Sequence, residues 1–169
     1  HVCLACPAGM TNAASDDASG VNTSCDAVLC AANEHVSSHQ CVPCVAGTTN
    51  AAGDDASGAD TQCDATICGV NERVVRHACV ACPAGKTNAA GGHDASGSDT
   101  ACTAVLCAAN EHVSKHACVA CAAGKTNAAG DNAFLGDTGC DVTVCEANRH
   151  VVGHACTACP DGTTNEAGD

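Results

Sequence analysis

The chain has 169 residues and a formal net charge of −13, and 18 residues are cysteine while only 23 are Leu, Ile, Val or Phe. Those 23 make up about 14% of the chain, below the roughly 20% at which a chain without other stabilisation is usually disordered. The negative charge and the lack of Trp and Tyr exclude a nucleic-acid-binding track, and no segment approaches the roughly 20 apolar residues of a membrane span. Cysteine bridges must therefore replace most of a hydrophobic core.

The cysteines repeat along the chain with a step of 38 residues, and one step of 39. The repeating unit is C-x2-C-x18-C-x4-C-x10, and a period of this length is typical of linear arrays. We expect small disulfide-rich tandem repeats that form an elongated rod of short β-hairpins and loops with little regular secondary structure. The expected repeats are 1–30 (truncated at its N-terminus), 31–68, 69–107, 108–145 and 146–169 (partial).

A glycine turn follows each C-x2-C pair. The glycine keeps a fixed offset, which predicts a positive φ at Gly9, Gly47, Gly85, Gly124 and Gly162. Thr and Asn come next, as in Thr49-Asn50, and we expect these side chains to bond the backbone of the turn.

An acidic segment, "AAGDDASGADT" at 51–61, comes next and offers hard oxygen ligands for calcium. The candidate ligands are Asp54, Asp55, Ser57 and Asp60, with Asp16, Asp17 and Ser19 in the first copy. Asn22 replaces Asp60 in that copy, His93 stands for an acid in the third, and no bidentate Glu follows. A solvated acidic turn is therefore favoured over a calcium site.

The segment "NEHVSSHQC" at 33–41 predicts a hairpin with Val36 on one arm, Ser37-Ser38 at the bend and His39 to Cys41 on the return. The expected core is little more than Val36, Val42, Val45 and their counterparts.

Zinc binding is an alternative interpretation of the same segment. His35, His39, Cys41 and Cys44 form the pattern H-x3-H-x-C-x2-C, which recurs at His112, His116, Cys118, Cys121 and at His150, His154, Cys156, Cys159. Arg73 replaces the first histidine in the remaining copy, and zinc would leave the C-x4-C pairs without a purpose. Polar hairpin histidines are favoured, with no metal and no cofactor expected, and zinc stays an alternative that requires reduced cysteines.

The stretch "CVPCVAGTTNAAGDDASGADTQCDATIC" at 41–68 resembles the cysteine-rich repeats of the tumour necrosis factor receptor family. The shared features are C-x2-C, then x-x-Gly-Thr, and a closing Asp-Thr-x-Cys; the Tyr that usually follows Gly-Thr and a further loop cysteine are missing. The resemblance implies alternating long and short bridges: Cys6–Cys25, Cys30–Cys41, Cys44–Cys63, Cys68–Cys79, Cys82–Cys102, Cys107–Cys118, Cys121–Cys140 and Cys145–Cys156. Cys3 and Cys159 remain over, and a topology with Cys25–Cys41 and Cys30–Cys44 stays possible.

The near-identical copies rich in "TNAAGDDASGADT" look like the cysteine-rich surface repeats of unicellular eukaryotes, such as ciliate immobilisation antigens and related algal or oomycete surface proteins. This resemblance implies an extracellular coat, appendage or filament built from copies of the chain and carrying glycans. Disulfides persist only in an oxidising compartment, which also indicates an extracellular or cell-surface protein. A receptor-type ligand-binding ectodomain is the alternative function.

No catalytic constellation is visible, so we expect no enzyme and no catalytic residue. The single-copy features are Met10, His93 and Phe134-Leu135; Phe134 is expected either to contact a neighbouring chain or to fold onto its own bridge. Asn22-Thr23-Ser24 is an N-glycosylation sequon, and Thr48 and Thr49 are candidates for O-linked sugars.

The terminal cysteines and His1 suggest a window cut from a longer array. His1 matches His39, His77, His116 and His154, so we expect more copies on both sides. End-to-end disulfides through Cys3 and Cys159 are the alternative.

Overall fold

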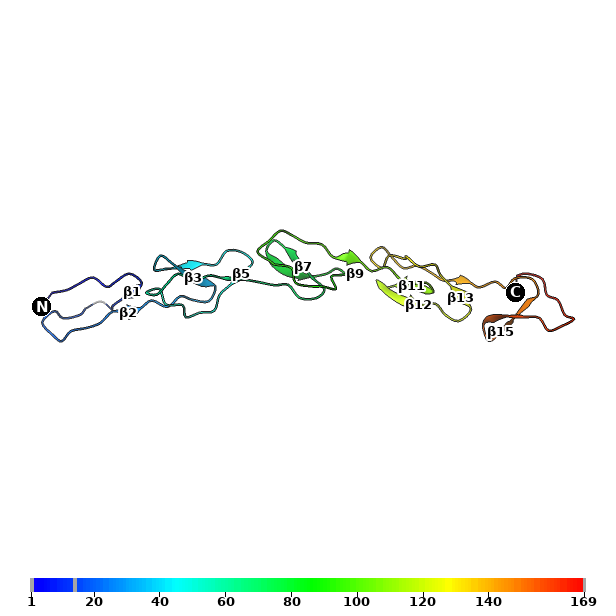
Figure 1. Ribbon diagram of the computed structural model, residues 1–169, viewed down its shortest axis with the longest axis horizontal. Coiled ribbons are helices and arrows are strands. Elements are labelled where there is room, and N and C mark those ends of the chain that lie inside the picture. The colour runs from blue at the N-terminus through cyan, green and yellow to red at the C-terminus, as the bar shows by residue number, and fades with distance from the viewer. Residues whose placement is uncertain (1, 14, 169) are drawn as a thin grey trace. The chain divides into compact units, whose positions relative to one another are not determined.

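The computed structural model describes residues 2–13 and 15–168, so the expected register of His1 lies outside the described residues. Those residues contain no helix and sixteen short strands, paired into eight antiparallel two-stranded sheets. Together with the bridges below, this confirms small disulfide-rich tandem repeats (Figure 1).

Two kinds of strand pair alternate along the chain. The longer hairpins are β3 (Glu34–Ser37) with β4 (Gln40–Pro43), β7 (Glu72–Val75) with β8 (Ala78–Ala81), β11 (Glu111–Ser114) with β12 (Ala117–Ala120), and β15 (Arg149–Val152) with β16 (Ala155–Ala158). The shorter pairs are β1 (Met10–Thr11) with β2 (Asp26–Ala27), β5 (Thr48–Thr49) with β6 (Asp64–Ala65), β9 (Lys86–Thr87) with β10 (Thr103–Ala104), and β13 (Lys125–Thr126) with β14 (Asp141–Val142).

The predicted hairpin at 33–41 is confirmed, with its bend one residue later than expected. Ser37 pairs with Gln40, which leaves Ser38 and His39 at the bend with φ of 50° and 59°. Positive φ at both central residues is the geometry that matches the twist of the flanking strands.

In three of the four longer hairpins, the side chain of one valine forms the centre of a small core. Val36, Val74 and Val113 are each 0% exposed, and buried alanine and cysteine side chains pack against Val74 and Val113. The expectation that Val42 and Val45 join this core is wrong, because they are 36% and 69% exposed. Val42 pairs with His35 and Val36 with Cys41, so the strand alternation turns Val42 away from the face that Val36 buries.

Sixteen cysteines form eight bridges along the chain, each between cysteines that are 11, 19 or 20 residues apart. The bridges are Cys6–Cys25, Cys30–Cys41, Cys44–Cys63, Cys68–Cys79, Cys82–Cys102, Cys107–Cys118, Cys121–Cys140 and Cys145–Cys156. These are the pairs that the receptor-type resemblance implies. A bridge across a loop of this length stabilises by on the order of 3 kcal/mol, which offsets the small cores.

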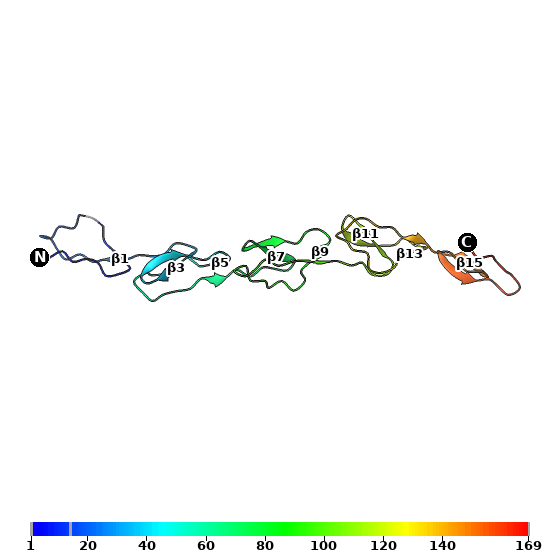
Figure 2. The same ribbon diagram turned by 90° about the horizontal axis from the view of Figure 1, so that it is seen from above.

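The chain divides into two compact units. Of the described residues, those up to 81 together with 90–101 form the first, which contains hairpins β3–β4 and β7–β8. Residues 82–89 with 102–168 form the second, which contains hairpins β11–β12 and β15–β16 (Figure 2).

Candidate functional site: the joint between repeats

Three of the four acidic loops pack against the turn glycine of the preceding repeat, and we call this contact the joint. The acidic loops are residues 16–23, 54–61, 93–100 and 131–138. A Cβ added at Gly9, Gly47 or Gly85 would lie closer than 3.0 Å to the backbone of Ala56, Ala95 or Ala133, respectively. The joint therefore occurs three times in the described residues, each time within one of the two units.

The joint glycines also need a left-handed backbone. Their φ values are 74° at Gly9, 81° at Gly47 and 77° at Gly85, and the positive φ predicted for the turn is thereby confirmed. A side chain is excluded twice over, since it would strain the backbone and would also collide with the next repeat.

Backbone hydrogen bonds hold the acidic loop 54–61 beside its joint glycine, Gly9. In the loop 54–61, the Ala56 N–H donates to the carbonyl of Val28 at 2.9 Å, and the Cys30 N–H donates to the carbonyl of Asp54 at 2.8 Å. Leu29 and Asp55 form an isolated β-bridge between them. Ala56 is 1% exposed in this arrangement, so the joint buries a side chain as well as satisfying the backbone.

The far end of the same loop covers the hairpin. Thr61 Oγ1 accepts a hydrogen bond from the Val36 N–H at 2.9 Å, and the Thr61 N–H donates to the Val36 carbonyl at 3.0 Å. Asp60 Oδ1 accepts from the N–H of the bend residue Ser38 at 2.8 Å. The same bonds recur at Thr100 and Asp99 over Val74, and at Thr138 and Asp137 over Val113. The threonine and the aspartate at the end of each of these loops therefore hold the loop over the buried valine of the hairpin.

Asp54 anchors the start of the loop. Its carboxylate accepts from Asn50 Nδ2 at 2.7 Å and from Thr61 Oγ1 at 2.5 Å. The bond from Thr61 and then that from Asn50 hold the pKa of Asp54 below its ordinary value, because both stabilise the ionised form. Asp131 has the same partners, Thr138 and Asn127, and a lowered pKa for the same reason.

The predicted role of Thr49 and Asn50 needs correction. Thr48, and not Thr49, bonds the turn, since its Oγ1 donates to the carbonyl of Val45 at 2.9 Å. Asn50 Nδ2 donates instead to the carbonyl of Glu34 at 2.8 Å and to Asp54, so it ties the loop to the hairpin. The reason is that the turn glycine forms the turn by itself, so the side-chain amide of Asn50 is available to bond the hairpin and the loop.

The candidate calcium ligands do not converge. Asp54 bonds Asn50 and Thr61, Asp55 Oδ1 accepts from the N–H and the hydroxyl of Ser57, and Asp60 bonds the hairpin bend. Among the described residues, none of the aspartates joins a cluster of three metal-ligand atoms. Each carboxylate therefore has a separate structural partner.

The four candidate zinc ligands are likewise separated. His39 lies at the bend, where its Nδ1 is 3.0 Å from the Ala56 carbonyl, so that nitrogen must carry the proton. Cys41 is bonded to Cys30 on the buried face of the hairpin, while His35 lies on the other face with Cys44.

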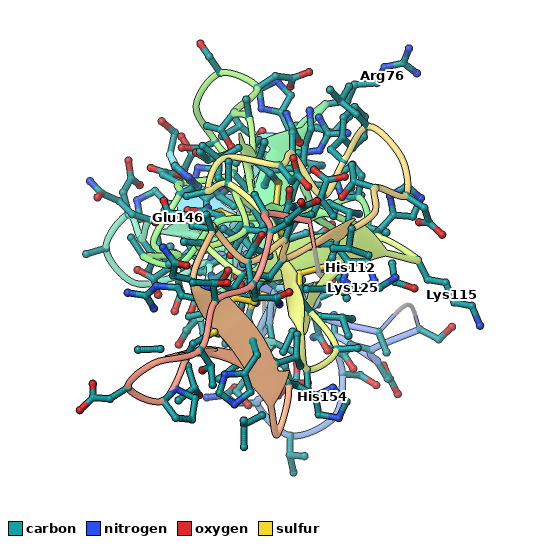
Figure 3. The ribbon with its side chains drawn as sticks, turned by 90° about the vertical axis from the view of Figure 1, so that its right-hand side faces the viewer. Arg76, His112, Lys115, Lys125, Glu146 and His154 are labelled. Atoms are coloured by element: carbon teal, nitrogen blue, oxygen red, sulfur yellow. A yellow bond between two sulfur atoms is a disulfide. The ribbon has the colours of Figure 1, made fainter. Side chains whose placement is uncertain are left out.

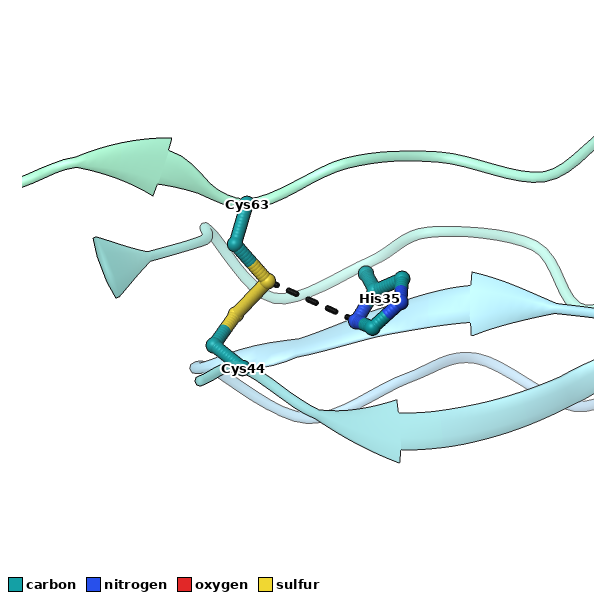
Figure 4. A group of neighbouring side chains, drawn as sticks. All are labelled: His35, Cys44 and Cys63. Atoms are coloured by element: carbon teal, nitrogen blue, oxygen red, sulfur yellow. Dashed lines mark hydrogen bonds between the residues drawn. A yellow bond between two sulfur atoms is a disulfide. The ribbon is translucent and has the colours of Figure 1, made fainter. Parts of the chain in front are cut away.

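His35 instead lies beside a disulfide, as Figure 4 shows. Its Nδ1 is 3.5 Å from the Sγ of Cys63, which is bonded to Cys44, and His112 lies 3.3 Å from Cys140 in the same way. The sulfur atoms are in bridges, so these clusters are not thiolate sites. At the corresponding position Arg73 has a buried Nε without a hydrogen-bond partner among the described residues.

Phe134 contacts Lys86 of the preceding repeat, which neither of the two expectations for this residue named. Its ring lies under the ammonium group of Lys86, 4.0 Å from the ring centroid, and the side chain is 40% exposed. Lys86 follows the joint glycine Gly85, and Phe134 follows Ala133, so the cation–π contact reinforces this joint.

The remaining candidate residues are all exposed or half-buried. Asn22 and Thr49 are exposed, and Thr48 is half-buried. Cys3 is exposed and Cys159 half-buried, both without a bridge. Met10 is a half-buried residue of β1, and the carbonyl of His93 accepts from the Cys68 N–H at 2.8 Å.

No protein-family model matches the chain, and neither a curated protein nor a solved structure matches it. The described residues contain no helix long and apolar enough to cross a membrane. Disulfides in this number are typical of extracellular or secreted proteins.

Sequence reasoning missed the alanine of the joint. Ala56, Ala95 and Ala133 are buried at 1%, 0% and 0%, although alanine is so common in the chain that it carried no signal by itself. Its fixed place after Asp54-Asp55 or their counterparts, with a glycine 47 or 48 residues earlier, is the pattern that identifies it.

Proposed function

We propose that the chain is a structural repeat protein of an extracellular surface, where it forms part of a coat, appendage or filament. The observation that carries the proposal is the joint, in which a side-chain-free glycine of one repeat receives the backbone of the next. This arrangement uses the most recurrent residues of the chain for contacts between repeats. The resemblance to cysteine-rich surface repeats of unicellular eukaryotes supports the same role.

The proposed protein is not an enzyme and works without a cofactor or metal. Its polar side chains recur from repeat to repeat and bond the loops to the hairpins. Its partners are copies of itself and attached glycans. Asn22 lies exposed in the first acidic loop, and a mass shift of the native protein on amidase treatment would show the N-linked sugar.

Electron microscopy of native material, with antibody labelling of intact cells, tests this function. We expect labelled fibres or a regular layer outside the cell. Label confined to the cell interior, or a dispersed secreted protein that never assembles, would contradict it.

A receptor-type ligand-binding ectodomain is the second candidate. The alternation of short-loop and long-loop bridges favours it, since tumour necrosis factor receptor-type repeats share that frame. Capture of a soluble protein ligand by the isolated chain, without self-assembly, would select this candidate.

The expected elongated form has its own measurement. Small-angle X-ray scattering should give a radius of gyration well above the roughly 15 Å of a compact domain of this length. A value near 15 Å would contradict the expectation.

A further inference from the structure

We propose that two of the long-loop bridges, whose cysteines are 19 or 20 residues apart, exchange with a small-molecule thiol, and that a histidine beside each bridge stabilises the sulfur that departs. The two sites are His35 with Cys44–Cys63 and His112 with Cys121–Cys140. This reactivity goes beyond the proposed structural function and is tested separately from it.

The imidazole of each site lies within hydrogen-bond reach of one sulfur of its bridge. His35 Nδ1 is 3.5 Å from Cys63 Sγ, as Figure 4 shows. In the second site His112, which is labelled in Figure 3, has its Nδ1 3.3 Å from Cys140 Sγ. A disulfide sulfur carries no hydrogen, so Nδ1 must be the donor in both sites.

This contact predicts which sulfur departs. In thiol–disulfide exchange a thiolate attacks one sulfur, and the other sulfur leaves as a thiolate at a rate that rises as that thiolate becomes more stable. An N–H that donates to a sulfur stabilises its thiolate form. Cys63 and Cys140 are therefore the departing residues, and the thiol attacks Cys44 and Cys121.

The exchange step balances without a further reactant. The S–S bond between Cys44 and Cys63 breaks, and a new S–S bond forms between Cys44 and the attacking thiolate. The electron pair of the broken bond stays on Cys63 Sγ, which takes up the proton that the incoming thiol released. The thiol is thereby oxidised and Cys63 is reduced. The products are a mixed disulfide on Cys44 and a free thiol on Cys63.

Exposure also separates the two sites from the short-loop bridges. All four cysteines of the two sites are half-buried. Each short-loop bridge, in contrast, has one cysteine that is only 2% exposed: Cys30, Cys68, Cys107 and Cys145. The bridges of the two sites are therefore the more accessible to a thiol.

The third repeat contains a natural control. Its long-loop bridge is Cys82–Cys102, and Arg73 stands at the place of the histidine. The Nε of Arg73 is buried and has no hydrogen-bond partner among the described residues. This bridge therefore lacks the contact that the imidazole makes in the two sites, and we expect it to exchange more slowly.

Exchange at such a bridge would loosen a joint. The loop that Cys44–Cys63 closes contains the whole acidic loop 54–61, which packs against Gly9. A mixed disulfide on Cys44 frees one end of this loop. The Ala56 amide, which is bonded within the joint, should then exchange with deuterium faster than in the intact chain.

Glutathione is the probe, added at neutral pH to the full chain after Cys3 and Cys159 have been alkylated. Early samples are quenched with acid, desalted and labelled with a maleimide, and their peptides are mapped by mass spectrometry. We expect the bridges of the two sites to open at least about tenfold faster than Cys82–Cys102, because a hydrogen bond to a charged sulfur is worth a factor of that order or more.

The position of each label distinguishes stabilisation of the departing sulfur from simple access. Early samples should carry glutathione on Cys44 and the maleimide on Cys63. In the second site, glutathione should be on Cys121 and the maleimide on Cys140. A bridge that is merely accessible would carry glutathione on either of its cysteines.

Loss of the donor is tested by His35→Leu, which should slow the opening of Cys44–Cys63 by about tenfold. The bridge Cys121–Cys140 of the same molecule is the internal control and should open at its wild-type rate. Unchanged protection of the Thr61 amide in the untreated variant would show that the repeat is folded.

Gain of the donor is tested by Arg73→His, which should speed the opening of Cys82–Cys102 by about tenfold, with glutathione on Cys82. Unchanged protection of the Thr100 amide, which donates to the Val74 carbonyl, would show that this variant is folded.

Three results would each overturn the proposal: equal opening rates of the three bridges, glutathione shared equally between Cys44 and Cys63, or a His35→Leu variant whose bridge opens as fast as in the wild type. A peptide map in which glutathione opens no bridge would do the same.

Discussion

Gly47 faces the backbone of Ala95 so closely that a Cβ on the glycine would lie less than 3.0 Å from the alanine carbonyl. The two residues are 48 positions apart, and their contact joins one repeat to the next. Gly124 has nearly the same φ, 76° against 81°, but no atom within 3.5 Å of its own added Cβ position. A comparison of Gly47 with Gly124 therefore separates the effect of backbone strain from that of steric collision.

Gly47→Ala should loosen its turn much more than Gly124→Ala. Both variants bear the left-handed strain, on the order of 1 kcal/mol, and only Gly47→Ala adds about 1–3 kcal/mol of overpacking. The probes are the amide exchange rates of Thr66, which donates to the Gly47 carbonyl, and of Thr143, which donates to the Gly124 carbonyl. Equal acceleration of both amides, with the Ala95 amide unchanged, would show that the contact contributes nothing.

Val36→Ala should destabilise its repeat by about 2–3 kcal/mol, because the side chain is 0% exposed and its loss leaves a cavity. Val42→Ala on the facing strand, 36% exposed, should cost less than about 1 kcal/mol. Native-state hydrogen exchange of the Thr61 amide, which bonds the Val36 carbonyl, measures the first. Comparable losses of stability from both substitutions would show that Val42 contributes to the core as much as Val36 does.

The cysteine spacing was enough to predict the repeats, the segment 33–41 predicted the hairpin, and the fixed offset of the turn glycines predicted their positive φ. The core was predicted less well, since Val42, Val45 and Val36 are all valines and the residue type alone does not show which of them is buried. Strand alternation decides which valine is buried, but applying it requires the pairing register of the hairpin. The observed bend lies one residue later than expected, which shifts that register. The joint was not predicted at all, because Gly47 and Ala95 meet only when two folded repeats are stacked.

Acid should detach the acidic loops unequally. The pKa of Asp54 is lowered by its bonds from Thr61 and Asn50, so its stabilising effect is complete above the ordinary value of 3.8. That effect is lost as the pH falls below 3.8 through the depressed pKa of the folded state. The loop 93–100 has His93 in place of Asp54 and offers the matched control.

The Thr61 amide should therefore lose more protection between pH 5 and pH 2.5 than the Thr100 amide, after correction for intrinsic exchange; both pH values are chosen to bracket the ordinary pKa of about 4. These amides donate to the carbonyls of Val36 and Val74, respectively. Asp55 and Asp94 have pKa values lowered by Ser57 and Ser96, so that contribution is common to both loops. Parallel losses would show that Asp54 is no anchor.

The bridge pattern itself is open to a chemical test. Cys41 lies on the buried face of its hairpin, where its Cα is 5.3 Å from that of Cys30, while Cys44 lies beyond the strand with its Cα 5.8 Å from that of Cys63. Both distances suit a bridge, and both bridges close a loop within one stretch of chain. Exchanging the partners of Cys41 and Cys44 would pull the strand end across the hairpin.

Digestion at low pH, which prevents thiol exchange, followed by fragmentation of the bridged peptides should recover Cys30–Cys41 and Cys44–Cys63 and their counterparts in each repeat. Alkylation before reduction should label Cys3 and Cys159 alone among the cysteines, since the other sixteen are in bridges. A Cys25–Cys41 or Cys30–Cys44 peptide would refute the ladder. It would also refute the joint, because Cys30 would no longer hold the segment that receives Ala56.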